Sequence, residues 1–164
     1  MVEPALLDPG QPGLIPVEPD PPYGEDIASH VCANGPASGA VSSAFGRSRG
    51  WRDDSGTSAW QFAGVFGEVT AAEVIVQVEG MLGCGEYEDW GSGFRGIHKA
   101  DLPVLAGADR RLMFCESTDE EPSRCTVLLA GGPVLSRLIV RARTEERAAD
   151  LACTLAVPAA AALR

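Results

Sequence analysis

The chain has 164 residues, 45% of them hydrophobic, which is enough to bury the core of one ordinary domain. No run of about 18 apolar residues occurs, so we expect no membrane-spanning helix. The formal net charge is −10, with 13 Lys and Arg against 23 Asp and Glu, so a phosphate backbone is repelled and nucleic acid is excluded as an expected partner.

The first stretch of the chain is acidic and rich in proline. Residues 1–46 contain six acidic residues and neither Lys nor Arg. Because proline lacks a backbone donor and disfavours helix, residues 1–22 are predicted to form an extended arm or tether, and residues 23–164 a single domain. The start lacks the positive and apolar regions of a secretory signal, so either the protein is cytoplasmic or the sequence is that of a mature form.

After the arm, the pattern predicts two strands joined by a turn. We expect a short helical turn at 24–32, a loop at 33–39, a strand at 40–47, a turn at 50–58 and a second strand at 59–66. In the second strand Trp60, Phe62 and Phe66 recur at period two and therefore share one face.

A helix follows the second strand. Thr70 and Glu73 have the spacing of a capping box, in which each side chain satisfies a backbone amide at the start of a helix. The apolar residues after it recur at helical spacing, and Gly83 is expected to end the helix.

The second half is predicted to contain a hairpin, a further strand and a helix. The expected order is a Gly-rich connection at 85–96, a loop at 98–108, paired strands at 110–115 and 126–130, a strand at 134–141 and a helix at 144–155 that Pro158 interrupts. The strand at 134–141 is apolar on both faces and should be central. These elements indicate an α+β fold, in which an antiparallel β-sheet is covered on one face by helices.

Five cysteines are present, and none forms the C-x-x-C spacing of common zinc sites, so no metal is expected. Cys115 and Cys125 flank a polar loop, while Cys32 and Cys84 are placed to tie the N-terminal segment to the end of the first helix. Two disulfides are favoured over the alternative in which these cysteines fill the core as free thiols. Cys153, on the apolar side of the last helix, is expected to be free. Two bridges imply an oxidising, extracytoplasmic compartment.

The order of features is similar to that of a known family. It comprises Leu6-Leu7-Asp8-Pro9, an early cysteine, two strands, a helix that ends in Cys84 and is followed by Tyr87 and Trp90, the segment L-P-V-L-A-G at 102–107, a Gly-Gly hairpin and a last amphipathic helix. Over nearly the whole chain this resembles the extracellular sensor domains of actinobacteria, found at the C-terminus of the mycobacterial kinase PknH and as free-standing lipoproteins. The resemblance implies a one-sided antiparallel sheet, two disulfides, a ligand-binding cleft and no catalysis.

The residues themselves give little support for an enzyme. His30 and His98 are the two histidines, and neither lies in a hydrolase or metalloprotease motif. The acidic residues at 86–89 have the chemistry for acid–base work, but a solvated acidic loop is the commoner interpretation. The glycines at 91–93 lack the Lys of a phosphate-binding loop. We expect no catalytic residue, no enzymatic activity and no cofactor.

The predicted ligand-binding residues are aromatics and arginines outside the clear core pattern. They are Trp51 and Arg52 in the first turn, and Tyr87, Trp90, Phe94 and Arg95 in the Gly-rich connection. Tyr and Trp on loops supply large contact area with few rotatable bonds. The alternative is that these aromatics cover the open edge or face of the sheet.

The expected function is therefore extracytoplasmic sensing or binding of a small molecule or cell-envelope ligand by a secreted or lipid-anchored domain. The alternative is a protein–protein interaction module whose acidic arm docks on a basic protein partner.

Overall fold

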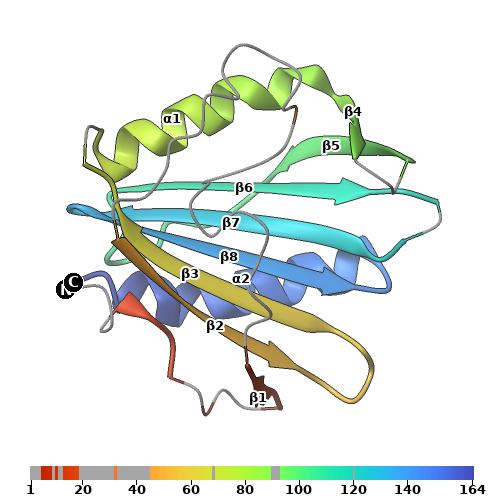
Figure 1. Cartoon of the computed structure of the whole chain (residues 1–164), viewed down its shortest axis with the longest axis horizontal. Coiled ribbons are helices and arrows are strands. Elements are labelled where there is room, and N and C mark those ends of the chain that lie inside the picture. Colours follow the sequence, from red (N-terminus) through yellow and green to blue (C-terminus); the bar gives the residue numbers. More distant parts are fainter. Residues whose placement is uncertain are drawn as a thin grey trace.

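The protein folds around one eight-stranded antiparallel sheet with the order β1-β2-β3-β8-β7-β6-β5-β4 (Figure 1). The computed structural model describes residues 5–8, 10, 13–18, 32, 45–67, 69–89, 93–119 and 121–164. Its strands are β1 (Ile15–Val17), β2 (Phe45–Arg52), β3 (Ser58–Val65), β4 (Glu86–Asp89), β5 (Gly93–Ala100), β6 (Arg110–Ser117), β7 (Ser123–Gly131) and β8 (Val134–Ala142). The predicted α+β class and the antiparallel sheet are confirmed, as is the central position of β8.

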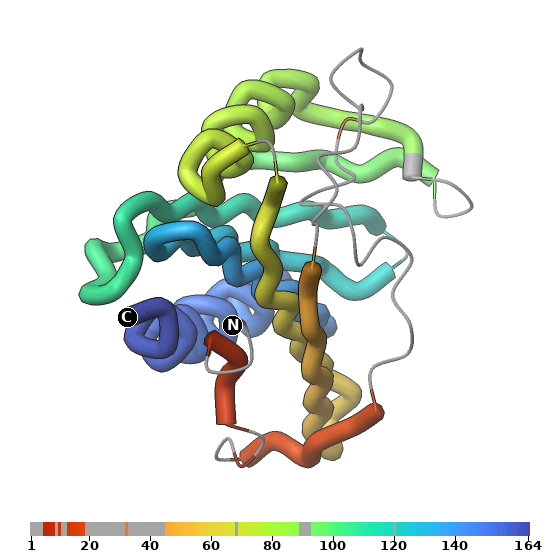
Figure 2. Tube along the Cα trace, turned by 60° about the vertical axis from the view of Figure 1, so that its left-hand side comes forward, coloured from red at the N-terminus to blue at the C-terminus, as the bar shows by residue number. Residues whose placement is uncertain are grey.

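Two α-helices pack on opposite faces of this sheet, whereas cover on one face was expected. Alternating residues of β6 and β7 belong to different cores. Met113 and Val127 pack with α2 (Glu145–Ala161), while Leu112 and Leu128 pack with α1 (Ala71–Met81). Because successive strand residues point to opposite faces, the two helices lie on opposite sides. Figures 1 and 2 show the strands between them. Apolar residues at consecutive positions of β7 and β8 therefore reflect burial on both faces.

Each α-helix is preceded by a threonine that caps its first turn. Thr70 accepts from the Glu73 amide at 3.2 Å, and the Glu73 carboxylate accepts from the Thr70 amide at 2.7 Å, which confirms the capping box. Thr144 caps α2 by accepting from the Arg147 amide. Pro158 does not interrupt α2, which continues to Ala161 because Ala159 and Ala160 after it are fully buried. Packing of these alanines outweighs the lost backbone bond at Pro158.

The strand predicted at 40–47 corresponds to β2 and ends later in the sequence than predicted. The chain turns at Asp53, whose Oδ1 accepts from the amides of Ser55 and Thr57, each at 2.9 Å, so β2 continues through Arg52. Gly50, expected in the turn, lies inside β2 beside the Trp60 ring. The side-chain-stabilised turn at Asp53 therefore sets the register of the β2–β3 hairpin.

Phe62 lies flat across neighbouring strands on the α1 side of the sheet. A Cβ atom built on Gly46 or Gly64 would lie 2.2 Å or 2.6 Å from the Phe62 ring. Glycine at both positions therefore makes the space that the ring occupies. Phe62 is buried, as its strand pattern predicted.

Parts of the predicted arm pack against the sheet, which corrects the expectation of a free tether over residues 1–22. Leu7 is only 2% exposed, and its amide donates to Gln61 Oε1 at 2.6 Å. Gln61 also donates to the Ala5 carbonyl at 3.0 Å. β1 pairs with β2. Proline content alone missed this docking because the apolar residues between the prolines find a partner surface on β2 and β3.

The Gly-rich connection expected at 85–96 and the start of the loop expected at 98–108 form strands. β4 and β5 pair as a hairpin, and β5 continues to Ala100 along β6. The acidic and aromatic residues there alternate with the period of two that is typical of a strand. The glycines between them made this period hard to recognise in the sequence. The helical turn expected at 24–32, apart from Cys32, and the loop expected at 33–39 lie outside the described residues.

Two disulfides connect the predicted cysteine pairs. Cys115 and Cys125 lie directly opposite each other in β6 and β7, with their Cα atoms 4.1 Å apart, rather than at the edges of a loop. Cys32 is bridged to Cys84 in the short 3₁₀ helix η3 (Leu82–Cys84), with a Cα–Cα distance of 6.1 Å. Cys153 is free and half-buried, its Sγ lies 3.8 Å from Met113 Sδ, and burial raises the pKa of its thiol. These are the cysteine roles that the sequence predicted.

Candidate binding site

The structure divides the predicted site residues between two distant parts of the sheet. Trp51 and Arg52 end β2, near one edge, whereas Tyr87, Phe94 and Arg95 lie on β4 and β5 at the other edge. Trp90 lies outside the described residues. The predicted site residues therefore do not form a single cluster.

Trp51 is a core residue and not a loop anchor. It is 0% exposed and packs in the apolar core beneath α2. The turn expected around it begins only at Asp53, so Trp51 remains in β2, where its side chain points inward. Arg52, the next residue, points to the other face and is exposed.

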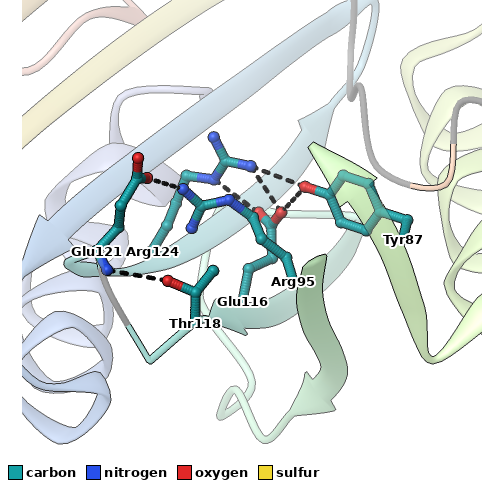
Figure 3. A network of polar contacts seen from close by, with 6 residues as sticks. All are labelled: Tyr87, Arg95, Glu116, Thr118, Glu121 and Arg124. Atoms are coloured by element: carbon teal, nitrogen blue, oxygen red, sulfur yellow. Dashed lines mark hydrogen bonds and ion pairs between the residues drawn. The ribbon is translucent and has the colours of Figure 1, made fainter. Parts of the chain in front are cut away.

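Tyr87 contributes to a buried polar network on the α1 side of the sheet (Figure 3). Glu116 on β6 is 1% exposed, and Arg124 on β7 binds it in two-pronged fashion, from Nε to Oε2 at 2.8 Å and from Nη2 to Oε1 at 2.6 Å. The Tyr87 hydroxyl donates to the same Oε1 and accepts from Arg124 Nη2 at 2.9 Å. The buried Glu116 carboxylate is thus compensated by a paired charge and a hydroxyl.

Arg95 lies beside this network, opposite Tyr87 in the register of β4 and β5. Its side chain is 5% exposed and forms an ion pair with Glu121, whose own amide donates to Thr118 Oγ1 at 2.9 Å. Figure 3 shows the Arg95–Glu121 ion pair together with the Tyr87, Glu116 and Arg124 network. Of the predicted residues, the structure thus brings together Tyr87 and Arg95.

Phe94 differs from its neighbours because its side chain is 64% exposed. It points to the face opposite Arg95, since the two are consecutive strand residues. Phe94 is therefore an exposed aromatic at the sheet edge and is separate from the polar network.

Sequence reasoning missed the arginines of β7 and β8. Arg124, Arg137 and Arg141 point to the same face as Arg95, because they alternate with core residues that pack under α2. The available signal was an arginine every few positions inside an otherwise apolar strand, as in L-S-R-L-I-V-R-A. We name this surface, which crosses the sheet from β2 near one edge to β4 at the other, the arginine half-face; it consists of Arg52, Tyr87, Arg95, Glu116, Arg124, Arg137 and Arg141, with Trp60 and Phe62.

The arginine half-face shares its side of the sheet with α1. The apolar residues Leu112, Leu128 and Leu135 pack under α1, and the polar residues lie farther along the same strands. Two guanidiniums there stack on aromatic rings: Arg137 on Phe62 at 5.6 Å and Arg141 on Trp60 at 5.3 Å from the ring centre. Ordered guanidiniums beside aromatic rings suit recognition of small polar molecules.

Across the described residues, no three His, Cys, Asp or Glu side chains come together in an arrangement that would hold a metal ion. Neither helix in that part of the chain has the length and apolarity needed to cross a bilayer. Compared with known proteins, the chain matches no protein-family model and no curated protein.

Proposed function

We propose that this chain is an extracytoplasmic, non-catalytic binding or sensing domain whose ligand site is the arginine half-face. The single observation that carries the proposal is the concentration of ordered arginine and aromatic side chains on one half of one sheet face. Polar surfaces on rigid strands are suited to binding because their side chains are held in place before the ligand arrives.

Two further observations support this function. Disulfides at Cys32–Cys84 and Cys115–Cys125 are typical of proteins that work in oxidising compartments. Both oxygens of Glu116 already accept bonds from Arg124, so this carboxylate positions a guanidinium instead of serving as a catalytic base. The role of the network is therefore to orient donors for a ligand.

Binding is tested by thermal stabilisation of the purified protein with a panel of small neutral sugars, nucleosides, amino acids, carboxylic acids and phosphates. We expect saturable stabilisation by at least one compound, strongly weakened in Arg141→Gln. Arg143→Gln is the matched control, because it makes the same charge change at an exposed position just after β8. Stabilisation by no compound, or equal loss in both variants, would contradict the proposed site.

The alternative function, a protein-interaction module that uses the acidic arm, has less support. Ala5, Leu6 and Leu7 of that arm are buried against the sheet. Co-purification of a protein partner that depends on residues 1–22, together with no small-molecule binding, would favour this alternative instead.

A further inference from the structure

We propose that the α2 side of the sheet carries a peptide-binding groove over β3 and β8, which residues 5–7 of this chain occupy as an intramolecular ligand. The partner that fits the groove is an extended segment of another polypeptide, with a small residue followed by two leucines. The groove and the arginine half-face lie on opposite sides of the sheet, so this inference does not depend on the ligand site proposed above.

Residues 5–7 cover a part of the sheet that lies beyond the main contacts of α2. The helix packs mainly on β7 and β8. Gln61 on β3 points to the same side as α2, because it alternates with Trp60 and Phe62 of the arginine half-face. Figures 1 and 2 show the segment beside the C-terminal end of α2, and Leu163 from that end packs in the same apolar cluster. The segment therefore extends the cover that α2 provides.

The main chain of the segment is held by a buried side-chain amide. Gln61 is 0% exposed, its Oε1 accepts from the Leu7 amide at 2.6 Å, and its Nε2 donates to the Ala5 carbonyl at 3.0 Å. The same Nε2 donates to Ser136 Oγ at 2.9 Å, and Ser136 is also 0% exposed. Gln61 thus bonds an extended main chain through both its N–H and its C=O groups, as a neighbouring strand does when a peptide adds to a sheet.

The polar floor of the groove requires an occupant. Without the segment, Gln61 would lose the donor to its Oε1 and one acceptor of its Nε2, and a buried polar group that lacks its partner costs free energy. Arg49 on β2 donates to the Leu7 carbonyl, so side chains of two strands bond three main-chain groups of the segment. Side chains that bond main-chain atoms read the shape of an extended peptide and accept it from any source.

The side chains of the segment give the groove its specificity. Leu7 is 2% exposed and packs in the core under α2, while Leu6 is 7% exposed and packs beside Ala63 in the smaller cluster. Ala5 is buried in that same cluster, where a larger side chain would displace its neighbours. In peptide recognition of this kind, main-chain bonds supply affinity and apolar sites supply specificity. The partner is therefore a peptide with a small residue before two leucines.

The segment is a separate unit from the strand that follows it. The sequence P-G-Q-P-G at 9–13 stands between it and β1, and two prolines and two glycines there disfavour a continuous strand. Asp8 ends the segment, because its Oδ1 accepts from the Gly10 amide at 2.7 Å. A short linker of this kind gives an attached ligand an effective concentration on the order of millimolar. The attached segment therefore closes the groove to weak peptides and yields to a tightly bound one.

The test uses the full chain and a fluorescent peptide of residues 2–9, V-E-P-A-L-L-D-P. Replacing both leucines, Leu6→Asp and Leu7→Asp, should expel the attached segment, because carboxylates are not stable in apolar sites. We expect the peptide to bind this double variant saturably in fluorescence anisotropy and to raise its thermal midpoint. Binding to the wild type should be at least about 100-fold weaker, because the attached segment competes.

Two matched variants test the role of the amide. Adding Gln61→Leu to the double variant should lower peptide affinity at least about tenfold, since it removes two hydrogen bonds to the peptide. Adding Gln77→Leu, the same change at an exposed position on α1, should change affinity by less than twofold. Equal losses in the two variants would overturn the groove at Gln61.

The remaining outcomes also decide the matter. A double variant that folds and binds no peptide overturns the proposal, as does equal binding of a control peptide in which both leucines are aspartate. If the double variant is unfolded, the wild-type peptide should restore its folding, and failure to do so would show that residues 5–7 are a permanent part of the core. Wild-type dimers that form at high concentration and are lost in the double variant would support the groove, with a second copy as the source of the peptide.

Discussion

The two faces of the sheet carry different chemistry. The face under α2 is mainly apolar, with Trp51, Val127 and Leu138 fully buried in one continuous core. The face under α1 is divided, since only part of it packs against α1 and the arginine half-face occupies the rest. The α2 face follows the ordinary rules of core packing, whereas the α1 face buries charged groups that fold stability alone does not require.

This difference indicates that the two faces of the sheet have different roles, one in stability and the other in binding. Burial under α2 supplies most of the hydrophobic free energy of folding, which leaves the strands rigid enough to hold charged side chains on their other side. Substitutions in the core under α2 should therefore reduce stability, whereas substitutions of exposed residues on the arginine half-face should leave stability nearly unchanged and reduce binding.

The largest expected effect comes from two adjacent residues that point to opposite faces. Trp51→Ala should destabilise the protein by about 3–5 kcal/mol, because it empties a large space in the core. Arg52→Ala should change the free energy of unfolding by less than about 0.5 kcal/mol, because Arg52 is exposed. Urea denaturation measures both, and equal losses would remove the contrast between the faces.

The buried network gives the next effect, and it lies on the arginine half-face. Glu116→Gln should cost about 3 kcal/mol, because it removes the buried carboxylate that pairs with the half-buried Arg124 guanidinium. Tyr87→Phe removes a single hydroxyl and should cost about 1 kcal/mol. A double-mutant cycle between Glu116 and Arg124 measures their coupling. A Glu116→Gln variant as stable as the wild type would show that the carboxylate is not required to hold Arg124.

The bridge across β6 and β7 strengthens the α2 face. Replacing Cys115 and Cys125 by alanine should lower the free energy of unfolding by about 2–3 kcal/mol, since the short loop between them is no longer closed in the unfolded chain. The oxidised wild-type protein should show one reactive thiol after denaturation without reductant, and Cys153→Ser should remove it. Five reactive thiols would contradict both bridges.

The helices and the cysteine pairs were the easier part to predict from sequence. The Thr70 capping box, the apolar spacing of the last helix and the cysteine pairs depend on local rules, and the structure confirms them. Trp51 was misassigned because the turn position depended on the Asp53 side chain, and the glycine at position 50 was interpreted as part of the turn.

The arginine half-face was harder to predict from the sequence. Its residues come from seven strands, β2 to β8, and their arrangement on one surface depends on the strand order, which single-sequence patterns do not encode. Tyr87 and Arg95 were identified by composition alone, whereas Arg124 was assigned to the polar loop between Cys115 and Cys125, and Arg141 to the end of a strand that is apolar on both faces. Pairing of distant strands therefore determined which of these side chains share a surface.

The smallest predicted effect lies at the edge of α1, where Glu79 joins the helix to the sheet. Its carboxylate accepts from Lys99 on β5 and from Arg110 on β6, the latter at 2.9 Å. These two cations hold the pKa of Glu79 below its ordinary value, through hydrogen bonds from Lys99 first and Arg110 second. A lowered pKa in the folded state means that the unfolded chain binds more protons, so this contribution is present above the ordinary pKa of about 4.3 and is lost as the pH falls through the folded-state value.

Glu79→Gln should therefore reduce stability at neutral pH by less than about 1 kcal/mol, because the carboxylate is one-third exposed and solvent screens the pair. The difference between wild type and variant, measured by urea denaturation, should shrink as the pH falls from about 5 to 3 and as salt is added. Glu146→Gln, at an exposed position on α2 across the sheet, is the matched control. A Glu79 effect that persists at pH 3 would mean that α1 is held by packing alone, and that the ion pairs at its edge contribute nothing to the α1 face.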